Sequence, residues 1–473
     1  MNESLKSHVN EVLLANLRFQ PTPGQSHLAA RLANFMVNST TGDTYIIKGY
    51  AGTGKTTMVG ALVKSLSSIG ARAVLLAPTG RAAKVMTGYS GRTASTIHRR
   101  IYRMDMAEGG GFSMKLAPNN SKNTFFIVDE ASMIPSQSAG DGAYSRNLLQ
   151  DLVSYVSSGE GCRLILVGDS AQLPPVGEEN SAALDVRYMM ARFALRAGHF
   201  ELTEVVRQEH ESGILFNATA LRNQIMGVDG FRFNITFNDV CRLTSSDVGE
   251  QLASDHGTFG AEQVIVVCRS NKSANNYNRQ IRFGSMWFTE EVNAGDHLMC
   301  TKNNYFWLDG ESGPSFIANG DMLRVARVNG FSEMYGFRFA NLSLEFIDYP
   351  DLPAFDAIIN LDSLHTEAPS LTNEQSNRLF QSVLASGSPD LSKTARAALL
   401  ASDSYYQALQ VKFGYAVTCH KAQGGQWKAV YVDQGYLTEE MVDRNYWRWL
   451  YTAVTRATEK LYLVNFSDRF FDQ

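Results

Sequence analysis

The sequence predicts an α/β protein built from two parallel-sheet cores, and three observations support this prediction. Short apolar runs that end in polar residues alternate with helix-like segments, which is the pattern of buried parallel strands. The same pattern returns from about residue 200 onward. A chain of 473 residues is also too long for one ordinary domain.

Composition indicates a soluble globular protein. Hydrophobic residues make up 44% of the chain and charged residues 19%, as in typical globular proteins. The start "MNESLKSHVNEVLL" lacks a signal-peptide pattern, and no apolar run reaches the length of a membrane span. The five cysteines include no C-x-x-C pair, which argues against a disulfide framework or a zinc ribbon. A net charge of −4 argues against a broadly basic surface but leaves room for a local basic groove.

The first core begins with an apolar run over residues 45–47, which leads into a glycine-rich loop and a helical pattern. The loop matches G-x-x-x-x-G-K-[ST] in the strand–loop–helix context that this phosphate-binding motif requires. Lys55 can reach the outer phosphates and the Thr56 hydroxyl can ligate Mg²⁺. The alternative is a glycine-rich turn with a surface lysine. The candidate nucleotide-binding residues here are Gly49, Ala51, Gly52, Thr53, Gly54, Lys55, Thr56 and Thr57.

Three more strands of the first core end in polar residues. These are Pro78 and Thr79 after "RAVLLA", Asp129 and Glu130 after "FFIV", and Asp169 and Gln172 after "RLILVG". Ligands of parallel α/β sheets bind beyond the carboxyl ends of the strands. We therefore expect these polar residues to gather around one ligand site.

The acidic pair suits metal-assisted phosphoryl chemistry. Asp129 can hold Mg²⁺ through water, and Glu130 can orient and deprotonate an attacking water. The alternative is an acidic pair that caps the next helix. Gln172 can sense the γ-phosphate, or it is a loop glutamine before a Pro-Pro turn. Gln25 offers an amide that suits an adenine edge, or it is only a helix-start residue.

The second half repeats the strand pattern in "EQVIVVCRSN", "FGYAVTCHKAQGG", "KAVYVDQG" and "KLYLVNFSD" but contains no second phosphate loop. This suggests one nucleotide held between two cores, with arginines that complete the site when the cores close. The candidate arginines are Arg207 and Arg456. Either could instead be an ordinary salt-bridged helix residue.

Eight segments in order resemble the motif series of superfamily 1 DNA helicases, and most closely the RecD/Dda-type branch. They are "GYAGTGKT", "APTGRAAK", "STIH", "VDEAS", "GDSAQLPPV", "LTEVVRQ", "VTCHKAQG" and "YTAVTRA". The resemblance extends from Gln25 to Arg456. It implies two RecA-like cores of the P-loop NTPase fold and an ATP hydrolase stimulated by nucleic acid. It further implies ATP and Mg²⁺ as cofactors, 5′-to-3′ movement on single-stranded DNA and unwinding of duplex DNA.

The resemblance also implies roles for particular residues. Gln25 would contact adenine, Gln172 would couple the γ-phosphate to DNA, and Arg207 and Arg456 would be arginine fingers. Gly424 would face the nucleotide cleft. Contacts to the DNA backbone would come from Pro78, Thr79, Thr96, His98, Thr418 and His420, because small hydroxyls and backbone amides suit contacts without sequence information. His98 could equally be a structural histidine, and we expect Cys419 to point into the core.

An insertion at residues 99–122 carries Glu108-Gly109-Gly110-Gly111 between the strand-like "RIYRMDM" and "FSMKL", which predicts a β-hairpin. In the family this hairpin is the pin that splits the duplex, and Phe112 is the candidate wedge because an aromatic ring can stack on a base pair. The alternative is a small hairpin whose phenylalanine covers local apolar surface. Residues 321–410 resemble an SH3-like and helical insertion in the second core.

The expected first core comprises residues 1–98 and 123–203, and the expected second core comprises 204–320 and 411–473. The expected partners are single-stranded DNA and duplex DNA at a fork, with a single-stranded-DNA-binding protein or replication and recombination proteins as candidates. We expect no membrane contact, a monomer and a cytoplasmic location in a bacterium or as a phage product. The closeness of Gln25 to the start favours a free-standing helicase of the compact phage type. RNA as substrate, an ATPase switch without strand separation and a P-loop kinase remain as alternatives.

Overall fold

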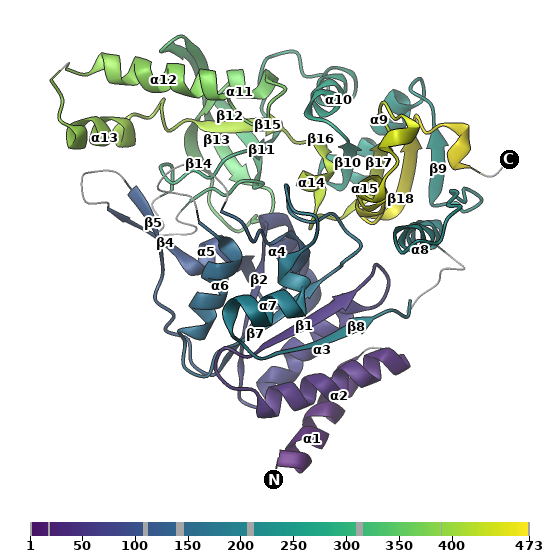
Figure 1. Cartoon of the computed structure of the whole chain (residues 1–473). Helices are drawn as coiled ribbons and strands as arrows, with labels where there is room; N and C mark the ends of the chain where they lie inside the picture. Colours follow the sequence, from purple (N-terminus) through teal and green to yellow (C-terminus); the bar gives the residue numbers. More distant parts are fainter. Residues whose placement is uncertain are drawn as a thin grey trace.

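The computed structural model describes residues 2–17, 19–106, 112–138, 146–205, 212–308, 316–388 and 390–471. Two parallel-sheet cores face each other, and a small barrel extends from the second core over the first (Figure 1). This confirms the predicted fold class. Within these residues, no helix is both long enough and apolar enough to cross a membrane.

The first core contains a six-stranded parallel sheet in the order β3-β2-β6-β7-β1-β8. The strands β1, β6 and β7 are buried along almost their whole length, as continuous apolar runs predict for a sheet covered on both faces, whereas the edge strand β8 is largely half-buried or exposed. The strands are β1 (Thr44–Gly49), β2 (Arg72–Ala77), β3 (Ala94–Thr96), β6 (Thr124–Val128), β7 (Arg163–Gly168) and β8 (Ala197–Leu202).

Helices cover both faces of this sheet. One face packs against α1 (Asn2–Ala15), α2 (Pro23–Asn38), α3 (Lys55–Ser68) and α4 (Gly80–Ser90). The other face packs against α5 (Ile97–Ile101), α6 (Leu148–Ser157) and α7 (Val186–Phe193). The ends of the strands are thus left as the edge where ligands can approach.

The second core contains a five-stranded parallel sheet in the order β16-β10-β17-β18-β9. Its strands are β9 (Val240–Leu243), β10 (Val264–Cys268), β16 (Ala416–Thr418), β17 (Trp427–Asp433) and β18 (Ala457–Val464). Its helices are α8 (Gly213–Ile225), α9 (Val248–Phe259), α10 (Asn271–Gly284), α14 (Cys419–Ala422) and α15 (Arg444–Val454).

A closed five-stranded barrel interrupts the second core. It comprises β11 (His297–Cys300), β12 (Met322–Met334), β13 (Phe337–Phe346), β14 (Phe355–Asn360) and β15 (Leu409–Phe413). The expected start of this insertion at residue 321 is wrong, because β11 pairs with both β12 and β15 and closes the barrel. For the same reason the barrel ends at Phe413 and not at residue 410.

Three helices lie between β14 and β15: α11 (Asp362–His365), α12 (Asn373–Ser386) and α13 (Lys393–Ser402). Leu379 and Val383 of α12 pack with Phe337 and Phe339 of β13 in a small core of their own. The helical half of the insertion is therefore anchored on the barrel (Figure 1).

The predicted hairpin follows α5. Strands β4 (Tyr102–Met106) and β5 (Phe112–Leu116) pair antiparallel, with Tyr102 opposite Leu116 and Met106 opposite Phe112. The expected glycine turn at residues 108–111 and the Phe112 side chain lie outside what the structure describes. The Tyr305 hydroxyl, from the segment after β11, donates to Met114 Sδ at 3.4 Å and links the hairpin to the barrel side of the molecule.

Candidate functional site

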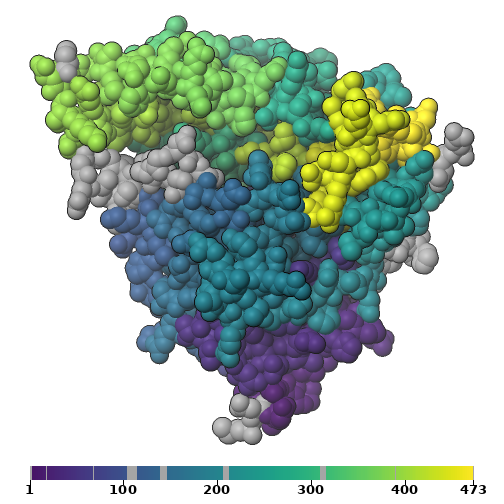
Figure 2. Space-filling model, viewed as in Figure 1, coloured from purple at the N-terminus to yellow at the C-terminus, as the bar shows by residue number. Residues whose placement is uncertain are grey.

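A cavity of about 350 Å³ lies between the two cores. The first core contributes the phosphate loop and the polar residues that follow β6 and β7, and the second core contributes the segment between α14 and β17 and the residues that follow α15. The boundary between the cores is visible in the space-filling view (Figure 2). The predicted site residues that line it are Gln25, Ala51, Gly52, Gly54, Lys55, Thr56, Thr57, Asp129, Glu130, Gln172, Gly424 and Arg456.

The phosphate loop connects β1 to α3. Gly52 and Gly54 adopt φ values of +76° and +82°, in the left-handed region that glycine enters without strain. The Thr53 hydroxyl donates to the Tyr50 carbonyl at 2.8 Å and fixes the turn. Lys55 begins α3, and its Nζ donates to the carbonyls of Gly49 and Tyr50 at 2.6 and 2.8 Å.

Asp129 and Glu130 follow β6 and differ in environment. Asp129 accepts hydrogen bonds from the Tyr89 hydroxyl at 2.6 Å and from the Glu130 N–H at 2.8 Å. Glu130 has a φ of +52°, a backbone conformation that non-glycine residues rarely adopt and that clusters at functional sites. Burial raises the pKa of Glu130 above its ordinary value, while Arg456 acts in the opposite direction.

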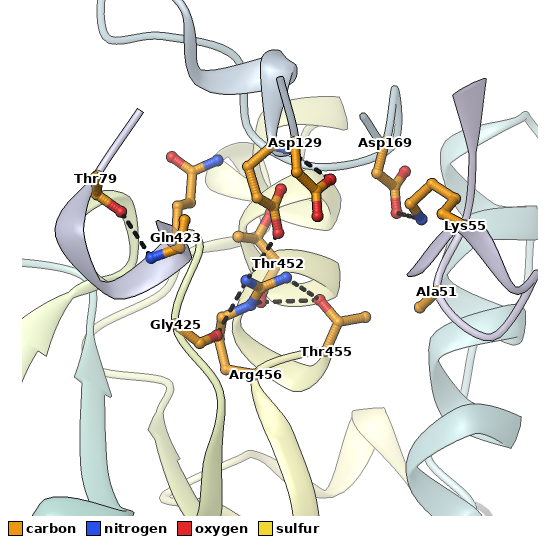
Figure 3. Close-up of polar contacts among 12 residues, drawn as sticks. Ala51, Lys55, Thr79, Asp129, Asp169, Gln423, Gly425, Thr452, Thr455 and Arg456 are labelled. Atoms are coloured by element: carbon orange, nitrogen blue, oxygen red, sulfur yellow. Dashed lines mark hydrogen bonds and ion pairs between the residues drawn. The ribbon is translucent and has the colours of Figure 1, made fainter. Parts of the chain in front are cut away.

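Arg456 follows α15 and reaches the acidic pair from the second core (Figure 3). Its guanidinium donates to the carbonyls of Thr452 and Gly425 at 3.0 and 3.2 Å and to the Thr455 hydroxyl at 3.2 Å. One guanidinium nitrogen lies 3.7 Å from Glu130 Oε1. Arg456 is thus held by neutral partners, with its charge directed at the carboxylate of the other core.

Asp169 and Tyr451 also belong to the site: Asp169 was expected near the ligand only as a strand-end residue without an assigned role, and Tyr451 was not predicted. The Tyr451 hydroxyl donates to Asp169 Oδ2 at 2.7 Å and accepts from the Ala51 N–H of the phosphate loop at 2.8 Å. Asp169 Oδ2 also lies 3.9 Å from Lys55 Nζ. Burial raises the pKa of Asp169, and Lys55 and Tyr451 oppose the shift. The available signal was the position of Tyr451 in "YTAVTRA", five residues before Arg456.

Two glutamines, Gln25 and Gln172, line the cavity, and a third, Gln423, lies beside it. Gln172 is buried, and its Oε1 has no hydrogen-bond partner among the described residues. Gln25 forms a capping box with Thr22 at the start of α2 and donates to the Thr53 carbonyl at 3.3 Å. Gln423 donates to the Leu173 carbonyl of the first core at 2.8 Å and therefore ties the cores together.

The candidate DNA contacts of the first core lie at the ends of β2 and β3. Thr79 caps α4, and Thr96 caps α5. Thr96 is fully buried, so its hydroxyl is not available to a ligand in this conformation. Burial lowers the pKa of His98 to about 4, so this ring is neutral at physiological pH. Pro78 is half-buried beside Thr79.

The candidate DNA contacts of the second core lie at the corresponding place. Thr418 ends β16, and His420 is exposed in the first turn of α14. Cys419 between them is buried, and burial raises the pKa of its thiol to about 12, which makes it unreactive. Arg207, the other predicted arginine finger, lies outside the described residues.

The donor set of the cavity fits a nucleoside triphosphate with a divalent cation. The phosphate loop offers backbone N–H groups at the positive end of α3. Gln172 Oε1 is a buried acceptor without a partner in the described part of the chain. Thr56 supplies an exposed hydroxyl and Asp129 a carboxylate, and such oxygen ligands suit Mg²⁺.

Comparison with known proteins agrees with this arrangement. A family described as an AAA domain matches residues 22–227, and a family described as a UvrD-like helicase C-terminal domain matches residues 413–464. The ATP-dependent RecD2 DNA helicase of Deinococcus radiodurans is 27% identical over 88% of this chain and 46% of its own length. The ATP-dependent DNA helicase dda of Enterobacteria phage T4 is 35% identical over 37% of each chain.

The chain therefore spans less than half the length of these two curated relatives. A crystal structure of Pif1 helicase from Bacteroides in complex with ADP-AlF3 and ssDNA covers 96% of this chain and 95% of its own, with 14% identity and a TM-score of 0.47. A likeness at that level does not bear on function. By its ordered motifs and its matches to both family models and to the RecD2 and Dda helicases, the chain is similar in sequence to superfamily 1 helicases of the RecD/Dda type.

Proposed function

We propose that this protein is an ATP-dependent DNA helicase that moves 5′ to 3′ on single-stranded DNA and unwinds duplex DNA. The observation that carries the proposal is a single cavity lined by a phosphate loop from one core and by Arg456 from the other. A site divided in this way is complete only when the cores are together, so hydrolysis can be coupled to their relative movement.

The residues divide the work of hydrolysis according to their chemistry. Lys55 leaves the Gly49 and Tyr50 carbonyls and turns to the outer phosphates. Thr56 and Asp129 would hold Mg²⁺, which neutralises charge on the phosphates. Glu130 orients a water molecule and accepts its proton, and a raised pKa suits a general base that works near neutrality. Arg456 supplies positive charge opposite the leaving group, and Gln172 reports the γ-phosphate.

Supporting the DNA half of the proposal, both cores present residues at the same edge of their sheets, Pro78 and Thr79 in the first and Thr418 and His420 in the second. Contacts of this kind grip the backbone without reading sequence. The hairpin beyond α5 is the candidate pin. We place the protein in the cytoplasm of a bacterium or of a phage-infected cell, acting as a monomer at forks where single-stranded-DNA-binding, replication or recombination proteins are candidate partners.

The test is the rate of steady-state ATP hydrolysis, measured without nucleic acid, with single-stranded DNA, and with single-stranded RNA of the same base sequence. We expect strong stimulation by DNA, loss of hydrolysis in Lys55→Ala, and loss of stimulated turnover with retained ATP binding in Arg456→Ala. Stimulation by RNA alone would show that DNA is not the substrate. Full turnover in Arg456→Ala would contradict a site shared between the cores.

A further inference from the structure

The barrel covers the part of the first core where DNA is expected, and it does so with buried acidic residues. Asp321 precedes β12, and Asp348 follows β13. Asp321 Oδ2 lies 3.0 Å from Arg99 Nη2, and Asp348 Oδ1 lies 3.3 Å from Arg81 Nη1 and 3.8 Å from Lys84 Nζ. Both carboxylate side chains are at most 2% exposed. Two carboxylates of the insertion thus face three cations on α4 and α5.

The contact centres on the first turn of α4, a helix of 11 residues that Thr79 caps. Asp321 Oδ1 lies only 2.7 Å from the position that a Cβ on Gly80 would occupy, and the Tyr349 hydroxyl lies 3.3 Å from it. A helix N-terminus attracts anions because its N–H groups and its dipole are positive. The carboxylate of Asp321 therefore packs directly against the first turn of α4, near the positive end of this helix.

The contact is poorly satisfied for a permanent interface. Asp321 Oδ1, Asp348 Oδ2, Arg99 Nε and the Tyr349 hydroxyl are buried and have no hydrogen-bond partner within the described residues. Buried polar atoms in stable interfaces are almost always paired, and each unpaired group costs free energy. Asp321 Oδ2 accepts hydrogen bonds from Arg99 Nη2 at 3.0 Å and from the Ala318 N–H at 2.9 Å, so each carboxylate leaves one of its oxygens unpaired against the cations.

The same cations suit the backbone of DNA. Arginine and lysine near a helix N-terminus are the usual ligands of DNA phosphates. Gly80 directly follows Pro78 and Thr79, and Arg99 follows Thr96 and His98, so these cations border the expected DNA track. Arg81 also donates to the Gln426 carbonyl of the second core at 3.1 Å, which places it where the two cores meet.

We propose that Arg99, Arg81, Lys84 and the first turn of α4 form a binding site for phosphates of the DNA backbone, and that Asp321 and Asp348 occupy this site in the DNA-free protein. The proposal rests on the proposed function and deepens it. DNA displaces the two carboxylates, so the barrel moves off α4 and α5 when the strand enters. Burial raises the pKa of Asp321 to about 6, with Arg99 opposing the shift, so the displaced carboxylate gains hydration when it leaves.

The test is equilibrium binding of a fluorescent single-stranded oligonucleotide to the full chain, measured by anisotropy. We expect Asp321→Asn and Asp348→Asn each to bind about tenfold more tightly than the wild type, because one competing charge is removed and tenfold corresponds to about 1.4 kcal/mol. The matched control is Asp351→Asn, an exposed residue in the same loop as Asp348. It changes the net charge equally and should alter binding less than about twofold.

A double-mutant cycle separates masking from a general effect of charge. Arg99→Gln should weaken binding about tenfold, and adding Asp321→Asn to it should give no further gain, because the masked cation is absent. Unchanged or weaker binding by Asp321→Asn and Asp348→Asn with wild-type melting curves would overturn the proposal. A full gain by Asp321→Asn in the Arg99→Gln background would also overturn it. Failure of the wild type to bind single-stranded DNA would instead reject the proposed function.

Discussion

Replacing Tyr451 by phenylalanine removes one hydroxyl that joins the second core to the phosphate loop of the first. Tyr451 lies on α15, is 1% exposed and bonds both Asp169 Oδ2 and the Ala51 N–H. The ring of phenylalanine fills the same space, so the substitution leaves packing intact. It changes only the two hydrogen bonds that cross the cavity.

The expected loss follows from the two partners. A hydrogen bond to a charged carboxylate contributes about 1.5–3 kcal/mol, and a neutral one about 0.5–1.5 kcal/mol. Asp169 keeps its bond from the Ala171 N–H at 2.9 Å, and the half-buried Ala51 N–H can recover water. We therefore expect a loss of about 2–3 kcal/mol in the free energy that holds the cores together.

This loss should appear in catalysis, because hydrolysis needs Arg456 and the phosphate loop in one cavity. At about 1.4 kcal/mol per factor of ten, a loss of about 2–3 kcal/mol should lower DNA-stimulated kcat/KM for ATP about 30-fold to 140-fold. Tyr446→Phe is the matched control, since Tyr446 lies on the same helix and its hydroxyl accepts a long hydrogen bond of 3.4 Å from Gln434 Nε2, within the second core. Unchanged kcat/KM in Tyr451→Phe, or an equal loss in Tyr446→Phe, would refute the reasoning.

Three further predictions concern other parts of the site. Burial raises the pKa of Glu130 and Arg456 lowers it, with a net shift above the ordinary value of 4.5, so the acid limb of the pH profile of kcat/KM should lie above pH 4.5. Arg456→Gln removes the lowering charge and should shift this limb to higher pH. A shift to lower pH contradicts the assignment of Glu130 as the base. His420→Ala should raise the DNA concentration needed for half-maximal ATPase stimulation about tenfold, whereas the neighbouring Cys419→Ala should leave it unchanged. Phe112→Ala should abolish unwinding of a forked duplex while DNA-stimulated ATPase persists, and equal loss of both would argue against a wedge.

Local sequence patterns predicted the parts of the site that lie within one segment. The phosphate loop, its strand and its helix are contiguous, and so are the acidic pair and β6, because a buried parallel strand must be apolar until it reaches the ligand edge. The hairpin could also be predicted locally, because a glycine turn joins two strand-like segments that are neighbours in the sequence. Gln25 shows the limit of such patterns, because its capping role and its contact with the phosphate loop coexist.

Contacts between distant segments were beyond these patterns. β11 belongs to the barrel only because it pairs with β15, more than 100 residues later in the chain. The link from Tyr451 to Asp169 and the contact of Asp321 with Arg99 likewise need the tertiary structure. None of these residues stands in a local pattern that indicates its partner. Periodicity reports which face of a segment is buried, but not what covers that face.

The most direct test of a 5′-to-3′ motor driven from the cavity between the cores is unwinding of matched duplexes that carry only a 5′ or only a 3′ single-stranded tail. With ATP and Mg²⁺, the account predicts strand separation from the 5′-tailed duplex, none from the 3′-tailed duplex and none from either with Lys55→Ala. Separation from the 3′-tailed duplex alone would contradict the direction of movement. Separation that persists in Lys55→Ala would contradict the role of the cavity itself.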